Sequence, residues 1–165
     1  MEQELFTITI DQIRCTGCRI CELACSLKRG SQLNKLSSRI RLVRYVCESR
    51  VYNSPTLCQN CCDPPCEKMC PTGATHRDPE TGLMAVDIDL CIGCKGCVYA
   101  CPFGACYIDT VTGKAFRCDQ CGGEPACVQL CPENVLSLVC NSDLNIQLRR
   151  RKRVLLPVSS LDVST

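Results

Sequence analysis

The sequence contains little of what an ordinary globular core is built from. It has no tryptophan, and only three phenylalanines and four tyrosines among 165 residues. The 45% hydrophobic content includes 20 cysteines, and without them the apolar fraction falls to about a third. A core this thin cannot offset the entropy lost when the chain becomes ordered. Something besides apolar packing must therefore stabilise the fold.

The sequence also lacks the signals of a secreted or membrane-spanning chain. Its first fifteen residues, MEQELFTITIDQIRC, are acidic and alternating, with neither a basic n-region nor an apolar h-region. No run of about 18 apolar residues occurs, so no direct membrane span is expected. Because a disulfide framework needs an oxidising compartment, we expect the cysteines to be metal ligands in a reducing cytoplasm. Export on a partner that carries the signal stays open.

Motifs for catalysis and nucleotide binding are missing as well. Gly93 and Gly96 do not complete a G-x-G-x-x-G fingerprint, and there is no P-loop. The C-x3-C-x2-C spacing of radical S-adenosylmethionine enzymes does not occur, and no nucleophile–base pair is recognisable. His76 is the single histidine, and neither a motif nor a neighbouring carboxylate selects it. The sequence thus predicts no catalytic residue.

The stretch Cys91–Pro102, CIGCKGCVYACP, carries the strongest motif in the sequence. It reads C-x2-C-x2-C-x3-C-P, the bacterial ferredoxin run in which three cysteines hold one [4Fe–4S] cluster and the fourth reaches a second. Because glycine tolerates positive φ, we expect Gly93 and Gly96 to let the backbone curl around the cluster. Pro102 is expected to end the helical turn that carries Cys101. A zinc site fits this run poorly, since zinc is usually held by two separated C-x2-C pairs.

Three further runs also end in C-x3-C. They are C-x2-C-x2-C-x3-C at Cys15, Cys18, Cys21 and Cys25, C-x2-C-x4-C-x3-C-P at Cys58, Cys61, Cys66 and Cys70, and C-x2-C-x5-C-x3-C-P at Cys118, Cys121, Cys127 and Cys131. Sixteen motif cysteines predict four [4Fe–4S] clusters held through iron. Since metal binding would supply much of the folding free energy, the apo protein is predicted not to fold.

Thiolates and cluster cores together give the holo protein a net charge of about −6, so the formal +2 does not favour a nucleic-acid partner.

An internal repeat connects the runs. CPTGAT at Cys70, CPFGAC at Cys101 and CPENVL at Cys131 share a fourth cysteine, a proline, a turn and a strand. One unit is a cluster site plus a short hairpin, and two units make a pseudo-twofold ferredoxin module. Strands are predicted at Leu5–Ile10, Ile40–Val46, Thr72–Thr75, Leu83–Asp87, Ala105–Thr110, Ala115–Arg117 and Val135–Val139, with a helix running from the first motif to Gly30.

The expected fold class is α+β: two pseudo-twofold bacterial-type 2[4Fe–4S] ferredoxin modules, one inserted into the other, with short β-hairpins and short helices. Residues 56–112 hold the second and third motifs and form the inserted module. Residues 1–55 and 113–148 hold the first and fourth motifs and form the split module. Residues 149–165 begin with the basic run Arg149–Arg153. We expect this tail to dock on a partner subunit; a counter-charge to the clusters and a solvated tail are the alternatives.

Four motifs in this order, with CQNCCDPPCEKMCP second and CIGCKGCVYACPFGA third, resemble the four-cluster electron-transfer subunits of multi-subunit oxidoreductases. Such subunits accompany molybdopterin enzymes, formate and carbon monoxide systems, and tungsten-dependent aldehyde oxidoreductases. The resemblance covers Asp11–Val139. The short GGEPA gap between Cys121 and Cys127 looks more like the small subunits of the tungsten aldehyde oxidoreductase and benzoyl-CoA reductase group.

The resemblance implies how the motifs share clusters, with motif one paired to four and motif two to three. Carried over by position, cluster 1 takes Cys15, Cys18, Cys21 and Cys131; cluster 2 takes Cys58, Cys61, Cys66 and Cys101; cluster 3 takes Cys91, Cys94, Cys97 and Cys70; and cluster 4 takes Cys118, Cys121, Cys127 and Cys25. Cys62 is an alternative to Cys61, which preserves the C-x2-C spacing. The cysteines outside the motifs, Cys47, Cys62, Cys106 and Cys140, are expected to be small buried apolar residues.

The function that the resemblance implies is electron transfer without catalysis. The protein would relay electrons to or from a tungsten- or molybdenum-pterin catalytic subunit, such as an aldehyde oxidoreductase or benzoyl-CoA reductase. An external ferredoxin or another redox subunit would be the second partner. The alternatives are an electron-transfer subunit of a formate, hydrogenase or carbon monoxide dehydrogenase system, a free-standing polyferredoxin, and a zinc-binding structural module.

Overall fold

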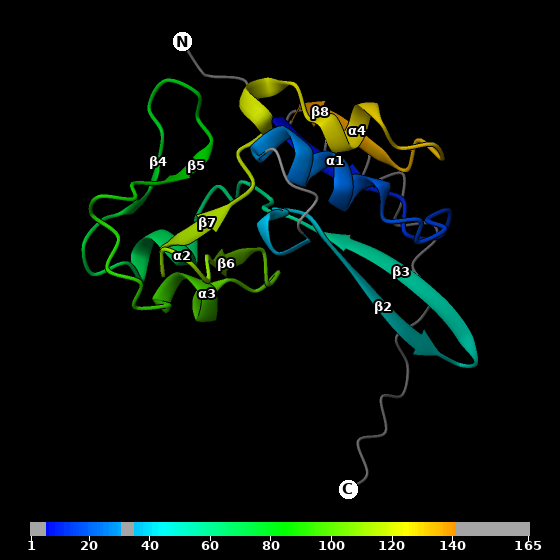
Figure 1. Ribbon diagram of the computed structural model, residues 1–165, viewed down its shortest axis with the longest axis horizontal. Helices are drawn as coiled ribbons and strands as arrows, with labels where there is room; N and C mark the ends of the chain where they lie inside the picture. Colours follow the sequence, from blue (N-terminus) through cyan, green and yellow to red (C-terminus); the bar gives the residue numbers. More distant parts are fainter. Residues whose placement is uncertain (1–5, 31–34, 141–165) are drawn as a thin grey trace, which may run out of the picture.

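The structure is a computed structural model that describes residues 6–30 and 35–140 (Figure 1). The predicted docking tail at 149–165 lies outside the described residues. Within the described part, short helices alternate with four two-stranded antiparallel sheets. The predicted α+β class with short strands and helices is therefore confirmed. None of the helices in this part is both long and apolar enough to cross a membrane.

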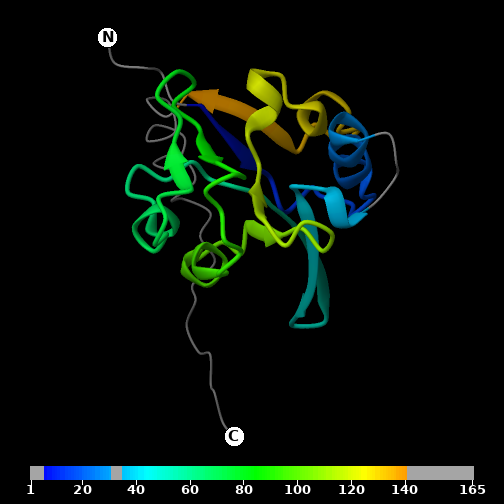
Figure 2. The same ribbon diagram turned by 60° about the vertical axis from the view of Figure 1, so that its left-hand side comes forward.

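Two distant parts of the sequence meet in the first sheet. Strand β1 (Phe6–Ile10) pairs antiparallel with β8 (Leu136–Cys140), in a register that places Ile10 opposite Leu136. Figure 2 shows these two strands side by side, in blue and orange. Beside them, helix α1 (Ile20–Arg29) contacts the short helix α4 (Ala126–Gln129). Their shared interior, called here the first core, consists of Ile8, Ile40, Leu57, Val135 and Leu136 with Cys21, Cys25, Cys118 and Cys127.

A second core lies under two short hairpins. One pairs β4 (Thr75–Arg77) with β5 (Met84–Val86), and the other pairs β6 (Cys106–Ile108) with β7 (Ala115–Arg117). Helices α2 (Pro65–Lys68) and α3 (Gly96–Ala100) pack together beside them. The buried residues of this second core are Cys66, Ala74, Met84, Cys91, Cys97, Cys106 and Ala115.

The turns of these two hairpins are built alike. In the first, the Asp78 side chain accepts hydrogen bonds from the main-chain N–H groups of Glu80 and Thr81. In the second, Asp109 accepts the equivalent bonds from Val111 and Thr112. The sequence repeat thus extends to the hydrogen bonds of the hairpin turns.

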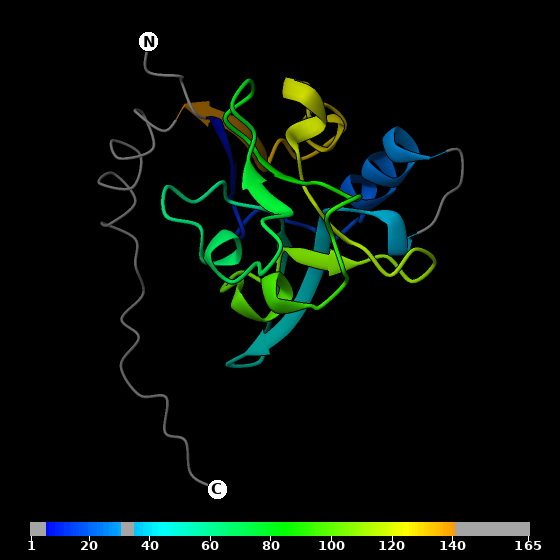
Figure 3. The ribbon, with the colours of Figure 1, turned by 90° about the vertical axis from the view of Figure 1, so that its left-hand side faces the viewer.

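A third hairpin, β2 (Arg41–Cys47) and β3 (Arg50–Thr56), projects from the body (Figures 1 and 3). The sequence predicts β2 but gives no signal for β3. The reason is the two-residue turn at Glu48 and Ser49, where φ is 48° and 63°. Turns with positive φ at both positions are usually Asn-Gly or Asp-Gly, and neither dipeptide occurs here.

The predicted strand at Thr72–Thr75 is wrong. Strand β4 begins only at Thr75, because the preceding residues form a turn in which the Gly73 N–H donates to the Cys70 carbonyl over 3.4 Å. The same turn follows two other fourth cysteines, closed by Gly104 and Asn134, and all three closing residues have positive φ. Two 3₁₀ turns, η1 (Lys35–Ser37) and η2 (Gln120–Gly123), complete the described part of the protein.

Candidate iron–sulfur sites

All four cysteine runs contain a left-handed residue immediately before their second cysteine. The residues and their φ values are Gly17 at 75°, Asn60 at 47°, Gly93 at 69° and Gln120 at 53°. Glycine adopts this conformation without steric cost, and asparagine does so more readily than most residues. The left-handed residue reverses the backbone locally, so that the first and second cysteines of each run can face one hollow.

The structure confirms this role for Gly93 and corrects it for Gly96. The second left-handed residue of that run is Lys95, at φ 65°, whereas Gly96 is the first residue of helix α3. Gly96 is instead a close-contact position, because a Cβ built on it would lie 3.0 Å from the main-chain oxygen of Met69. As predicted, helix α3 stops before Pro102, ending at Ala100.

Three of the four expected ligand sets surround hollows in the protein surface. The first hollow is lined by Cys15, Cys18, Cys21 and Cys131. The second is lined by Cys58, Cys61, Cys66 and Cys101 together with Cys106 and Arg117. The third is lined by Cys70, Cys91, Cys94 and Cys97. Each hollow therefore combines three cysteines of one run with the fourth cysteine of another.

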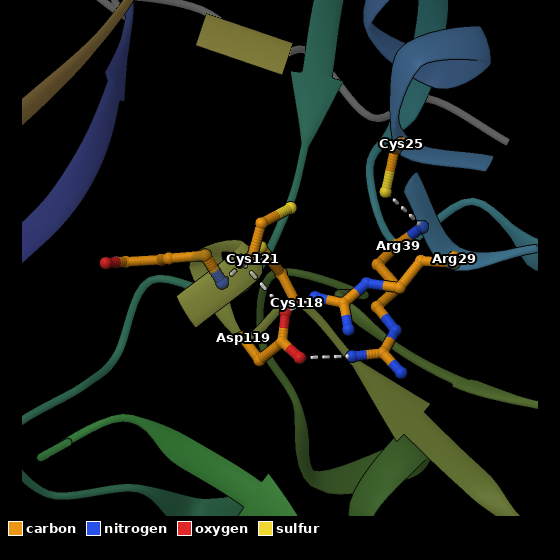
Figure 4. Close-up of polar contacts among 7 residues, drawn as sticks. Cys25, Arg29, Arg39, Cys118, Asp119 and Cys121 are labelled. Atoms are coloured by element: carbon orange, nitrogen blue, oxygen red, sulfur yellow. Dashed lines mark hydrogen bonds and ion pairs between the residues drawn. The ribbon is translucent and has the colours of Figure 1, made fainter. Parts of the chain in front are cut away.

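The fourth expected set shares the first core. Cys25, Cys118 and Cys127 are buried there, and the Cys25 Sγ accepts a hydrogen bond from the Arg39 main-chain N–H over 3.2 Å (Figure 4). The Asp119 carboxylate, beside Cys118, accepts from Arg39 Nη1 over 2.8 Å and also pairs with Arg29. Two guanidinium groups and one carboxylate therefore lie next to this set.

Main-chain N–H groups point at the sulfur atoms of several runs. Besides Arg39 on Cys25, such donors are Thr75 on Cys70, Ala105 on Cys101, Ala115 on Cys91 and Gln120 on Cys118, at N···S distances of 3.4 Å. Hydrogen bonds to sulfur are a principal means by which proteins set the potential of iron–sulfur clusters. Four-cysteine sets, three of them with main-chain N–H donors aimed at one or two of their sulfurs, thus provide the donor set and surroundings that a [4Fe–4S] cluster needs.

Burial alone disfavours the anionic form of several of these thiols. It raises the pKa of Cys21, Cys118 and Cys127 to about 12, because the thiolate loses its hydration there. A metal centre reverses this preference, since a coordinating thiol is deprotonated outright. Binding of a cluster to these cysteines is therefore expected to release protons.

In the described part of the protein, no three Cys, His, Asp or Glu side chains converge closely enough to hold a single metal ion.

The cysteines outside the motifs differ from one another. Cys47 and Cys62 are exposed, so the expectation that they are buried is wrong. Cys61, and not Cys62, lines the second hollow. Cys106 is buried as expected, but it makes polar contacts: its thiol donates to Cys97 Sγ over 3.5 Å, and this bond lowers the pKa of Cys97.

Sequence reasoning missed Arg117, the last residue of β7. Its Nη1 donates to Cys66 Sγ over 3.0 Å, and its Nη2 contacts Thr75 Oγ1 at 3.3 Å and Cys106 Sγ at 3.6 Å. The alternation of the strand carried a signal, because Arg117 lies on the same inward face as the small residue Ala115. An arginine at an inward strand position needs a buried partner.

Comparison with protein families adds the decisive observation. Residues 49–141 match the model of the 4Fe-4S dicluster domain. The chain belongs to the 4Fe-4S dicluster family. This membership confirms the prediction of an iron–sulfur protein of ferredoxin type.

Relatives of this dicluster protein are subunits of oxidoreductases. It is 40% identical over 131 residues to the polyferredoxin-like subunit of aliphatic sulfonate oxidoreductase from Pyrococcus furiosus, covering 79% of this protein and 74% of the relative. It is 36% identical over 137 residues to the electron transfer subunit PhsB of thiosulfate reductase from Salmonella typhi, covering 76% and 71%. These similarities agree with the expected electron-transfer role.

One similar solved structure is the active-site complex BamBC of benzoyl coenzyme A reductase with 1,5-dienoyl-CoA. One of its subunits matches with a TM-score of 0.51 and 23% identity, over 93% of both proteins. At this level of identity the match supports the fold of the dicluster protein and says nothing about its substrate.

Proposed function

We propose that this protein is the electron-transfer subunit of a multi-subunit oxidoreductase and carries four [4Fe–4S] clusters. The observation that carries the proposal is the set of three hollows, each lined by four motif cysteines from two runs. When bound, the clusters would supply one-electron chemistry at potentials set by ligands, hydrogen bonds and burial. The protein's own residues hold the thiols in place and direct N–H groups at the sulfurs.

The proposed ligand sets are those expected from the sequence. Cluster 1 would bind at the first hollow, cluster 2 at the second and cluster 3 at the third. Cluster 4 would bind Cys118, Cys121, Cys127 and Cys25. Cys25 reaches this set from helix α1, which contacts α4, the helix that carries Cys127.

We further propose the two-module arrangement, with residues 56–112 inserted between 1–55 and 113–148. It is supported by the two cores: the first draws its motif cysteines chiefly from runs one and four, and the second from runs two and three. Cys58 packs against both cores. A cluster at the second hollow would therefore lie nearest the boundary between the modules and could pass electrons between them.

The proposed partner is a catalytic subunit that contains a tungsten- or molybdenum-pterin. Two observations support this partner. Relatives are named as subunits of aliphatic sulfonate oxidoreductase and thiosulfate reductase, and the GGEPA gap resembles that of the tungsten group.

The test is affinity purification of the full-length protein from its native host under anaerobic conditions, followed by metal analysis. We expect a larger subunit to co-purify with tungsten or molybdenum, and dithionite reduction to produce the EPR signals of reduced [4Fe–4S] clusters. A monomeric iron–sulfur protein would support a free-standing polyferredoxin instead. A colourless protein that contains zinc would overturn the proposed function.

A further inference from the structure

No carboxylate of the described residues pairs with the buried guanidinium of Arg117. The residue is only 4% exposed, and none of the ion pairs among the described residues includes it. Asp119, two residues further along, pairs with Arg29 and Arg39 instead. A buried charge without compensation is strongly destabilising, so the groups that do contact Arg117 must provide the compensation.

The contacts of Arg117 are sulfur atoms and one hydroxyl. Nη1 donates to Cys66 Sγ, and Nη2 contacts Cys106 Sγ and Thr75 Oγ1. Cys66 lines the second hollow. A thiolate there, bound to a cluster of net negative charge, would be a counter-charge to the guanidinium, which no carboxylate of the described residues provides.

Cys106 extends this contact toward the third hollow. Its sulfur lies 3.6 Å from Arg117 Nη2 and 3.5 Å from the sulfur of Cys97, to which its thiol donates. Arg117 therefore contacts a cysteine of the second hollow directly, and a cysteine of the third through one intervening thiol. Among the described motif cysteines, the guanidinium bonds directly only to Cys66 of the second hollow, and Thr75, which it also contacts, lines the third.

We propose that Arg117, acting through its hydrogen bond to Cys66, raises the reduction potential of the cluster at the second hollow. The inference rests on the proposed function. Reduction adds one electron, and hence one negative charge, to a cluster. A permanent positive charge and an N–H donor at Cys66 stabilise the reduced form more than the oxidised form. Arg117 would thereby favour residence of the electron on this cluster during transfer.

The experiment compares the unmodified holo protein with Arg117→Gln by EPR-monitored redox titration. We expect the potential of one cluster to become more negative, corresponding to about a tenfold loss in its reduction equilibrium constant, or about 59 mV for a one-electron couple. Arg50→Gln is the matched control, because Arg50 is an exposed arginine at the start of strand β3. It should leave every cluster potential unchanged.

The outcomes separate this inference from the proposed function. If the unmodified protein shows no [4Fe–4S] signals, the proposed function fails. If those signals are present and Arg117→Gln leaves every potential unchanged, or shifts all of them equally, only the role of Arg117 is overturned.

A second measurement does not depend on the stability of the glutamine variant. The holo protein is produced in cells supplied with arginine that carries ¹⁵N in its guanidinium group. Pulsed EPR of the reduced protein should then show ¹⁵N coupling to the cluster at the second hollow. This coupling should disappear in Arg117→Lys, which keeps the charge but lacks the guanidinium fork. A coupling that is absent from the unmodified protein, or that persists in Arg117→Lys, overturns the proposal.

Discussion

The backbone of Gly93 lies so close to Gly113 that a Cβ built on Gly93 would stand 2.4 Å from the main-chain oxygen of Gly113. This contact joins the third cysteine run to the turn between β6 and β7. The neighbouring Lys114 strengthens the junction, because its Nζ donates to the Cys91 carbonyl over 2.5 Å. The turn thus supports the loop that carries Cys91 and Cys94.

Gly93→Ala should therefore disturb the third hollow more than an ordinary glycine substitution does. The matched control is Gly73→Ala, because Gly73 has the same φ of 69° but nothing within 4 Å of its Cβ position. Both variants incur the left-handed penalty of roughly 1–2 kcal/mol, and only Gly93→Ala adds a collision with the main chain. We expect a lower melting temperature and lower iron content for Gly93→Ala than for Gly73→Ala. Equal losses in the two variants would contradict the close-contact argument.

The amount of iron tests the number of clusters. Sixteen motif cysteines in four sets predict about sixteen iron atoms and sixteen sulfides per protein molecule. Anaerobic iron and sulfide assays on the purified holo protein should give these values. A content near half would show that the cysteines of the first and fourth runs do not assemble their two clusters.

Sharing of cysteines between runs is tested by Cys101→Ser. Cys101 lines the second hollow with cysteines of run two, although it belongs to run three. We expect the variant to damage the cluster bound by Cys58, Cys61 and Cys66 and to spare the cluster of its own run. EPR spectra of the reduced variant can separate the two cases. Selective loss of the signal assigned to Cys91, Cys94 and Cys97 would make the crossed assignment wrong.

The sequence predicted the features that depend on local covalent spacing. The four runs predict the iron–sulfur class that the family comparison confirms, and the repeat following Cys70, Cys101 and Cys131 corresponds to one turn made three times. Strand β7 was predicted with its observed bounds, Ala115–Arg117. These features follow from glycine, proline and cysteine positions, whose backbone preferences are strong.

Features that depend on tertiary contacts were not predictable in the same way. Strand β3 is stabilised by pairing with β2 around a turn whose residues give no turn signal. Asn60 and Gln120 occupy left-handed positions, and the side-chain amide of each donates to the Phe6 carbonyl. That shared acceptor on β1 cannot be read from spacing. The role of Arg117 likewise depends on sulfur atoms up to 51 residues away.

The C-terminal segment is tested by deletion of residues 149–165. These residues include five consecutive basic side chains, Arg149–Arg153, followed by apolar residues. Ordering such a segment costs entropy that is recovered only in a complex. We expect the truncated protein to keep its iron and to co-purify less with its catalytic partner. Undiminished co-purification would place the docking surface elsewhere on the protein.

The last prediction concerns the charge of Asp119 beside the proposed cluster 4. Its carboxylate pairs with Arg29 and Arg39 and also accepts a hydrogen bond from the Cys121 N–H over 3.0 Å. Burial lowers the pKa of Arg39, and the nearby Arg29 lowers it further. Asp119 therefore compensates two crowded positive charges at the site where the Arg39 main chain contacts Cys25.

Asp119→Asn should shift the potential of cluster 4 to more positive values, because the two guanidinium charges lose their counter-charge and stabilise the reduced cluster. This shift is opposite in sign to the one expected for Arg117→Gln, and it should affect a different EPR signal. Asp63→Asn is the matched control, since Asp63 also lies in a cysteine run but forms an exposed pair with Lys68. Exposed pairs contribute little and are screened by salt. An EPR-monitored redox titration that finds a negative shift for Asp119→Asn, or the same shift in both variants, would show that the Asp119 carboxylate does not set the charge at this site.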